Sequence, residues 1–120
     1  MEKVINARAL GANVKRWRED MGLTVEKLAE YTETSPSHIN NIESASSGIS
    51  AEKLVRIANA LEVPLDLLLC DSLKGEANRQ ARIMEYYTLL EDCTEAEAKI
   101  IMTMLYTLKK ELKMLRKAGK

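Results

Sequence analysis

The chain has 120 residues, of which 46% are hydrophobic and 30% charged, a balance that suits one compact domain with an appendage. Its 18 Lys and Arg residues match 18 Asp and Glu residues, so no global positive field would attract nucleic acid or an anionic membrane. No apolar run approaches the ~18 residues of a membrane span, and the N-terminus lacks a signal peptide's apolar region. We therefore expect a cytoplasmic protein without a membrane partner.

Catalytic and metal sites are not expected. The two cysteines, Cys70 and Cys93, lie far apart in the sequence, and His38 is the only histidine. A zinc site needs about four such ligands at short spacings, and an activated nucleophile needs a base beside it. We expect no enzyme, no cofactor and no bound metal.

Short helices are predicted along residues 1–70, with little that favours strands. Leu10, Val14, Trp17 and Met21 recur on one helical face, and Gly22 stands where a glycine commonly ends a helix. Four more helices are predicted to begin at capping residues or at prolines in the first helical position. These starts are Thr24, Ser35 followed by Pro36, Ser50, and Pro64. Five short helices indicate an all-α domain held together by packing, because such helices are marginal alone.

The polar, glycine-containing stretch 71–76 is expected to be a linker, and two longer helices are predicted after it. The first covers about residues 76–91. Thr94 and Glu97 form a capping box for the second, at about 94–117. That helix carries an apolar seam with heptad spacing: Ala98, Ile101, Leu105, Leu108, Leu112 and Leu115. A helix about 36 Å long with such a stripe needs a partner. It either folds back on the helical core of its own chain or pairs with the same helix of a second subunit, which two-fold operators favour.

Polar side chains dominate one face of the helix predicted at 35–43. If Ile39 and Ile42 point inward, then Ser37, Asn41 and Ser44 lie opposite and Asn40 lies on the flank. Asparagine pairs bidentately with adenine, and serine contacts several base edges, so this face is suited to the major groove of DNA. Composition alone leaves a plain solvated face as an equal alternative.

A family resemblance favours the DNA-binding interpretation. It is carried by Leu10-Gly11, Val14, Arg18, Gly22-Leu23-Thr24, Leu28-Ala29, Ser35, Ile39, Ile42-Glu43, Leu54, Ile57-Ala58, Ala60-Leu61 and Val63. With these residues the chain resembles the Cro/C1-type helix-turn-helix family of phage repressors and bacterial regulators. The resemblance implies a five-helix lambda-repressor-like DNA-binding domain at 8–70, with its helix-turn-helix motif at about 24–43. It also implies a two-helix C-terminal hairpin at 77–120 that serves dimerisation.

The resemblance further implies roles for single residues. The 35–43 helix would be the recognition helix, and Arg18 would pair with Glu43 at its end. Phosphate contacts are expected from the helix starts at Thr24 and Ser35 and from Lys15 and Arg16. His38 would either touch DNA or serve as a partly exposed structural residue.

This chain departs from the family pattern at several positions. Val25 replaces a glutamine that the family uses on the DNA backbone, Glu33 replaces the turn glycine, and Pro36 occupies a frequent base-reading position. The recognition helix carries no Arg or Lys, so the strongest contact to guanine is missing and A·T pairs are favoured.

The leading hypothesis is a bacterial or phage-encoded, nucleoid-associated transcriptional repressor. It would bind double-stranded DNA as a homodimer through the dimerisation seam, Ile101, Leu105, Leu108, Leu112 and Leu115. Related regulators use such a tail to oligomerise or to meet an antagonist, so a protein antagonist is a further expected partner. The alternative is a protein-interaction module, such as an antitoxin or adaptor with weakened DNA binding. Specific, salt-dependent binding to duplex DNA distinguishes the two.

Overall fold

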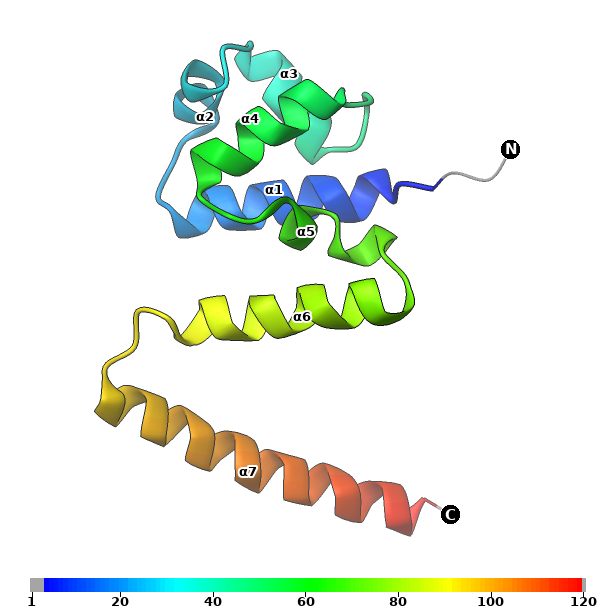
Figure 1. Ribbon diagram of the computed structural model, residues 1–120, viewed down its shortest axis with the longest axis vertical. Coiled ribbons are helices and arrows are strands. Elements are labelled where there is room, and N and C mark those ends of the chain that lie inside the picture. The colour runs from blue at the N-terminus through cyan, green and yellow to red at the C-terminus, as the bar shows by residue number, and fades with distance from the viewer. Residues whose placement is uncertain (1–3, 120) are drawn as a thin grey trace. The chain divides into compact units, whose positions relative to one another are not determined.

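The computed structural model describes residues 4–119, in which every regular element is a helix, so the all-α prediction is confirmed (Figure 1). The helices are α1 (Ala7–Asp20), α2 (Val25–Tyr31), α3 (Pro36–Glu43), α4 (Ala51–Leu61), α5 (Leu65–Leu68), the 3-10 turn η1 (Cys70–Ser72), α6 (Gly75–Leu90) and α7 (Glu95–Ala118). The chain forms two compact units, Met1–Glu85 and Tyr86–Lys120. Helix α6 crosses from one unit into the other.

Side-chain caps begin most of these helices where the sequence predicts. The hydroxyls of Thr24, Ser35 and Ser50 each accept a hydrogen bond from a backbone N–H in the first turn of their helices. Each cap satisfies a backbone donor that would otherwise have no partner, which contributes about 1 kcal/mol. Pro64 is the exception: it lies one position earlier than expected, at the N-cap of α5, and offers no side-chain bond.

Helices α1 to α5 enclose one hydrophobic core. The fully buried side chains Leu28, Ile39 and Ile57 come from α2, α3 and α4. Each contributes about 1.5–3 kcal/mol by leaving water. The cluster is completed by Leu10, Val14, Ala29, Ile42, Leu54, Ala58, Leu61 and Leu68. These are the apolar positions that helical spacing predicts, so the local pattern and the core agree.

The expected linker at 71–76 is held against α1. The Asn13 side-chain amide donates to the Leu68 carbonyl at 3.1 Å and to the Asp71 carboxylate at 3.0 Å. The Asn6 N–H donates to the Ser72 hydroxyl at 2.9 Å. With these bonds the first compact unit continues past this segment to Glu85.

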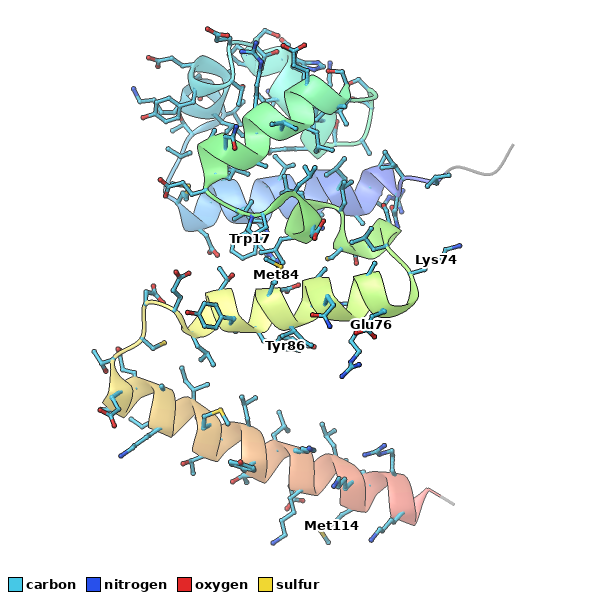
Figure 2. The ribbon with its side chains drawn as sticks, in the orientation of Figure 1. Trp17, Lys74, Glu76, Met84, Tyr86 and Met114 are labelled. Carbon is cyan, nitrogen blue, oxygen red and sulfur yellow. The ribbon has the colours of Figure 1, made fainter. Side chains whose placement is uncertain are left out.

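The first half of α6 packs on the same unit. Ala81 is buried, and the Asn78 amide donates to the Cys70 carbonyl at 2.6 Å. Figure 2 shows Trp17 of α1 and Met84 of α6 pointing toward each other. The residues up to Glu85 therefore extend the five-helix domain.

In the second unit, α7 begins at a capping box formed by Thr94 and Glu97, as predicted. The Thr94 hydroxyl accepts from the Glu97 N–H at 3.1 Å, and the Glu97 carboxylate accepts from the Thr94 N–H at 2.9 Å. The hydrogen bond from the Thr94 backbone N–H lowers the pKa of the Glu97 carboxyl below its ordinary value. Helix α7 then continues without a break to Ala118.

Candidate nucleic-acid interface

Helix α3 buries one edge and exposes a polar, uncharged face. Ile39 and Ile42 are 0% and 3% exposed, which fixes the rotation of the helix. The four side chains expected on the outer face are exposed: Ser37, Asn40, Asn41 and Ser44. His38 lies half-buried at the side. The structure thus brings all the expected base-reading residues to one short helix surface.

An ion pair with little solvent exposure fastens α3 to α1. Arg18 Nε donates to one Glu43 carboxylate oxygen at 2.7 Å, and Nη2 donates to the other at 3.1 Å. A third bond runs from Arg18 Nη1 to the Leu23 carbonyl at 2.8 Å. The side chains of Arg18 and Glu43 are only 10% and 8% exposed. The hydrogen bond to Glu43 raises the pKa of Arg18 further above its ordinary value.

Gly11 lets the two helix backbones approach closely. A Cβ atom at this position would lie 2.4 Å from the Ile42 carbonyl oxygen and 2.7 Å from that of Glu43. No side chain fits such a distance, so only glycine permits this crossing of α1 and α3. The bidentate pair and the close crossing together hold α3 in place on the domain.

The turn between α2 and α3 forms without its usual glycine. Glu33, which replaces the turn glycine, adopts the left-handed conformation with φ 54°. The Thr34 N–H donates to the Ala29 carbonyl at 2.9 Å, and the Glu33 N–H donates to the Glu30 carbonyl at 3.3 Å. These two bonds close the end of α2 in the Schellman pattern. The Glu33 carboxylate also pairs with Arg56 of α4, which draws the turn toward the core.

A small hydroxyl network ties Asn41, one of the side chains expected to contact bases, to the loop after α3. Ser46 Oγ donates to Asn41 Oδ1 at 3.2 Å and lies 2.9 Å from Ser44 Oγ. Ala45 between them has φ 60° and closes the end of α3. The bond from Ser46 links the Asn41 side chain to the loop through its amide oxygen. Sequence periodicity could not find Ser46, because loop residues carry no helical pattern.

The residues expected to contact phosphates differ in whether they are free to do so. Thr24 and Ser35, which cap the starts of α2 and α3, are exposed, and Lys15 is exposed on α1. Arg16, in contrast, pairs with Glu85 at 3.3 Å and stacks over the Trp17 ring at 4.8 Å. It lies 160° around α1 from Arg18, the residue that faces α3. This placement argues against Arg16 as a phosphate ligand.

Within residues 4–119 no three His, Cys, Asp or Glu side chains cluster to hold a metal ion. Over the same residues, no helix is both long enough and apolar enough to cross a membrane.

Comparisons with known proteins agree with this geometry. Residues 14–68 match the protein family described as Helix-turn-helix. The competence pilus inhibition repressor of Acinetobacter baylyi is 31% identical over 71 residues, which cover 58% of this chain and 64% of that protein. The structure of the clp gene regulator ClgR from Corynebacterium glutamicum aligns over 71% of this chain and 89% of its own, with 29% identity and a TM-score of 0.53.

A third similarity extends into the C-terminal helices. The structure of Bacillus thuringiensis PlcR in complex with the peptide PapR7 and DNA aligns over 88% of this chain and 37% of its own. Its identity is 27% and its TM-score 0.53. The match to the Acinetobacter repressor spans 64% of that protein's length.

These matches define the class of one segment. Residues 14–68 are a helix-turn-helix domain of the type found in transcription regulators. The resemblance to Cro/C1-type regulators is thereby confirmed for this segment.

Proposed function

We propose that the protein is a sequence-specific transcriptional repressor that binds an inverted-repeat operator as a homodimer through α3. The main support for this proposal is the exposed face of Ser and Asn side chains on α3. The Arg18–Glu43 pair and the close approach of α1 and α3 at Gly11 hold this helix in place. A rigid recognition helix in a helix-turn-helix domain is suited to lie in the major groove.

The base preference follows from the side chains on this face. Asn40 and Asn41 are exposed, and each offers both a donor and an acceptor, which matches the N6 and N7 atoms of adenine. Arg and Lys are absent from α3, so guanine would be contacted weakly. We expect half-sites rich in A·T pairs.

Affinity is expected to depend on phosphate contacts outside α3. The starts of α2 and α3 present backbone N–H groups and the positive ends of helix dipoles, and Lys15 adds a side-chain charge. With about 4–6 phosphates neutralised per subunit, affinity should fall steeply as salt rises.

The dimer is assigned to the C-terminal region. In this proposal residues 8–70 bind DNA, the segment 71–85 anchors α6 to that domain, and α7 pairs the subunits. Four seam residues of α7 are half exposed or more: Leu105, Leu108, Leu112 and Leu115. The relatives are regulators of bacterial genes, which supports a cytoplasmic location.

Selection from a random duplex library with the full chain, at near-physiological salt, tests this function. Enrichment of an A·T-rich inverted repeat is the expected result. Asn41→Ala should then lose about 5- to 150-fold in affinity for the enriched site, because one bidentate contact is worth about 1–3 kcal/mol. Asn59→Ala removes an exposed asparagine from α4 and is the matched control, with unchanged affinity. A library without enrichment would refute specific DNA binding.

A protein-interaction module is the second candidate. Its specific support is the exposed apolar face of α7, together with Val25 and Pro36 at positions where the family contacts DNA. The PlcR structure holds a peptide as well as DNA, which makes a peptide or protein antagonist a reasonable partner for such a face. Failed selection combined with a complex formed through α7 would favour this function.

A further inference from the structure

Helix α7 carries a face of positive charge along its second half. Residues 109–119 contain five cations and one carboxylate, Glu111, which gives a net charge of +4. All five cations are exposed, and within residues 4–119 none of them forms an ion pair; the ion pair of α7 joins Lys99 to Glu95 near its start. We call this set the basic face: Lys109, Lys110, Lys113, Arg116 and Lys117.

Helical geometry places these cations together. At 3.6 residues per turn they fall within an arc of about 120°, and the middle of this arc lies about 120° from the middle of the dimerisation seam. Tyr106, which is 70% exposed, falls inside the same arc, and Glu111 lies almost opposite it. The basic face is therefore a surface separate from the seam.

The helix dipole accounts for only part of this charge. Cations are favoured in the last turn of a helix, which here holds Arg116 and Lys117. The effect fades beyond that turn, and Lys109 lies more than two turns before the end of α7 at Ala118. The earlier cations of the basic face therefore need another explanation.

The first compact unit supplies little positive charge for binding DNA. Residues 4–85 contain ten cations and twelve carboxylates, and α3 contains no Lys or Arg. Six of the ten cations pair with carboxylates of the same unit, as Arg16 does with Glu85 and Arg18 with Glu43. The other four are spread over the unit: Arg8, Lys15, Lys53 and Lys74. Because a duplex carries one negative charge per about 1.7 Å, further cations would strengthen its binding.

We propose that the basic face of α7 binds the phosphate backbone of the duplex that α3 recognises. This inference rests on the proposed function and adds a second contact surface to it. From Lys109 to Lys117 the basic face extends about 12 Å, a length over which duplex DNA carries about seven phosphates. Lysines bind phosphates as point charges, and Arg116 and the Tyr106 hydroxyl can donate hydrogen bonds to phosphate oxygens.

The first unit of the same chain fits the basic face less well than DNA does. Within residues 4–85, seven of the twelve carboxylates already pair with cations of that unit. The other five come from four different segments: Glu19, Asp20, Glu26, Glu62 and Asp66. They offer no continuous row of negative charge like that of a duplex.

An anionic membrane also fits less well. A helix lying on such a membrane would bury the seam and bring both edges of the seam to the lipid headgroups. Arg116 borders one edge, but Glu111 borders the other, and anionic headgroups would repel it. Phosphates of DNA need to contact only the basic face.

The salt dependence of DNA binding tests the proposal. For a random-sequence duplex of about 30 bp, log affinity falls with log salt by about 0.9 for each phosphate that the protein neutralises. In the full-length chain, Lys110→Gln combined with Lys113→Gln should reduce this slope by about 1.8 per chain and weaken binding at about 100 mM salt at least tenfold. Lys110→Arg combined with Lys113→Arg keeps both charges and should keep the slope. Fluorescence anisotropy of a labelled duplex measures these affinities.

Lys74→Gln combined with Arg79→Gln is the matched control. It removes two exposed cations of the first unit and makes the same change in net charge. Its slope should equal that of the parent. An equal reduction in both double variants would show an effect of net charge alone and would overturn the proposal. A parental slope for Lys110→Gln with Lys113→Gln would overturn it as well.

Two further measurements identify a different occupant of the basic face. A parental slope combined with a lower Tm in the Trp17 fluorescence of Lys110→Gln with Lys113→Gln would assign the face to the first unit of the same chain. A parental slope combined with sedimentation of the parent on vesicles of phosphatidylserine and phosphatidylcholine would assign it to an anionic membrane. Either result would overturn the contact with DNA.

Library selection keeps this inference and the proposed function separate. Enrichment of a site, together with a parental slope for Lys110→Gln with Lys113→Gln, would keep sequence recognition and reject the role of the basic face. A reduced slope without any enrichment would keep the contact between α7 and phosphates and reject the sequence-specific repressor.

Discussion

Removal of the Glu43 carboxylate is expected to destabilise the first compact unit strongly. Arg18 is held by two hydrogen bonds to Glu43 and one to the Leu23 carbonyl, and both charged side chains are at most 10% exposed. In Glu43→Met the guanidinium stays buried with only the Leu23 bond. Loss of one partner from a buried pair costs about 3–5 kcal/mol, and the pair lies at the edge of the core, so we expect about 3 kcal/mol.

Thermal unfolding measures this loss. Trp17 is the only tryptophan and lies in α1, so its fluorescence reports on the unit that contains the pair. For a unit of this size 1 kcal/mol lowers the Tm by about 4–8 °C, which predicts a fall of about 12–24 °C. Circular dichroism reports on all the helices together. It should show a second transition for α7 only if the two units unfold at different temperatures.

Two further variants show whether burial is the cause. Glu30→Met breaks the exposed pair with Lys27 at 3.5 Å and should change stability by no more than about 0.5 kcal/mol. Arg18→Met combined with Glu43→Met removes both charges and should recover much of the loss. A Tm for Glu43→Met within about 3 °C of the parent would refute the reasoning.

Three more predictions concern the same unit. Gly11→Ala should lower the free energy of unfolding in urea by about 1–3 kcal/mol, because its Cβ would meet a carbonyl oxygen at 2.4 Å. Gly48→Ala, which has open space around its Cβ, should lower it little. Equal urea midpoints for the two variants would contradict the close crossing of α1 and α3. The hydrogen bond from its asparagine partner on α1 lowers the pKa of Asp71, so this carboxylate adds stability above about pH 3.8 that is lost as pH falls through its folded pKa. Acid unfolding of Asp71→Asn should therefore depend less on pH, and an unchanged slope argues against this contribution. Burial raises the pKa of the Cys70 thiol. At about pH 8 a thiol reagent should therefore modify the half-buried Cys93 first and Cys70 only on unfolding. Similar modification rates for the two cysteines would show that Cys70 is accessible.

Helix starts were predictable because capping is local. Thr24, Ser35 and Ser50 bond to amides three residues away, so the sequence near each start contains the whole interaction. The same is true of the capping box at Thr94 and of the left-handed turn at Glu33. Pro64 shows the limit of this reasoning, since proline fits both the N-cap and the first helical position, and the packing around α5 selects between them.

Part of the candidate site also followed from the sequence. The outer face of α3 depends only on the helical period once Ile39 and Ile42 are inward, and both are buried. The pair of Arg18 with Glu43 came from the family resemblance and not from spacing, because 25 residues separate the two. Without the resemblance, nothing in the local pattern joins them.

The helices, their caps, the inward residues and the heptad spacing of α7 could be predicted from local sequence, since each depends on neighbours within a turn or two. Which charges are free to meet a ligand depends on packing between distant segments. Arg16 is exposed by local pattern, yet its partner Glu85 lies 69 residues away on α6. Asp71 follows a helix in a stretch that suggests a linker, yet Asn13 of α1 binds it across 58 residues. Such contacts form when distant helices pack together, and no periodicity in a single segment encodes them.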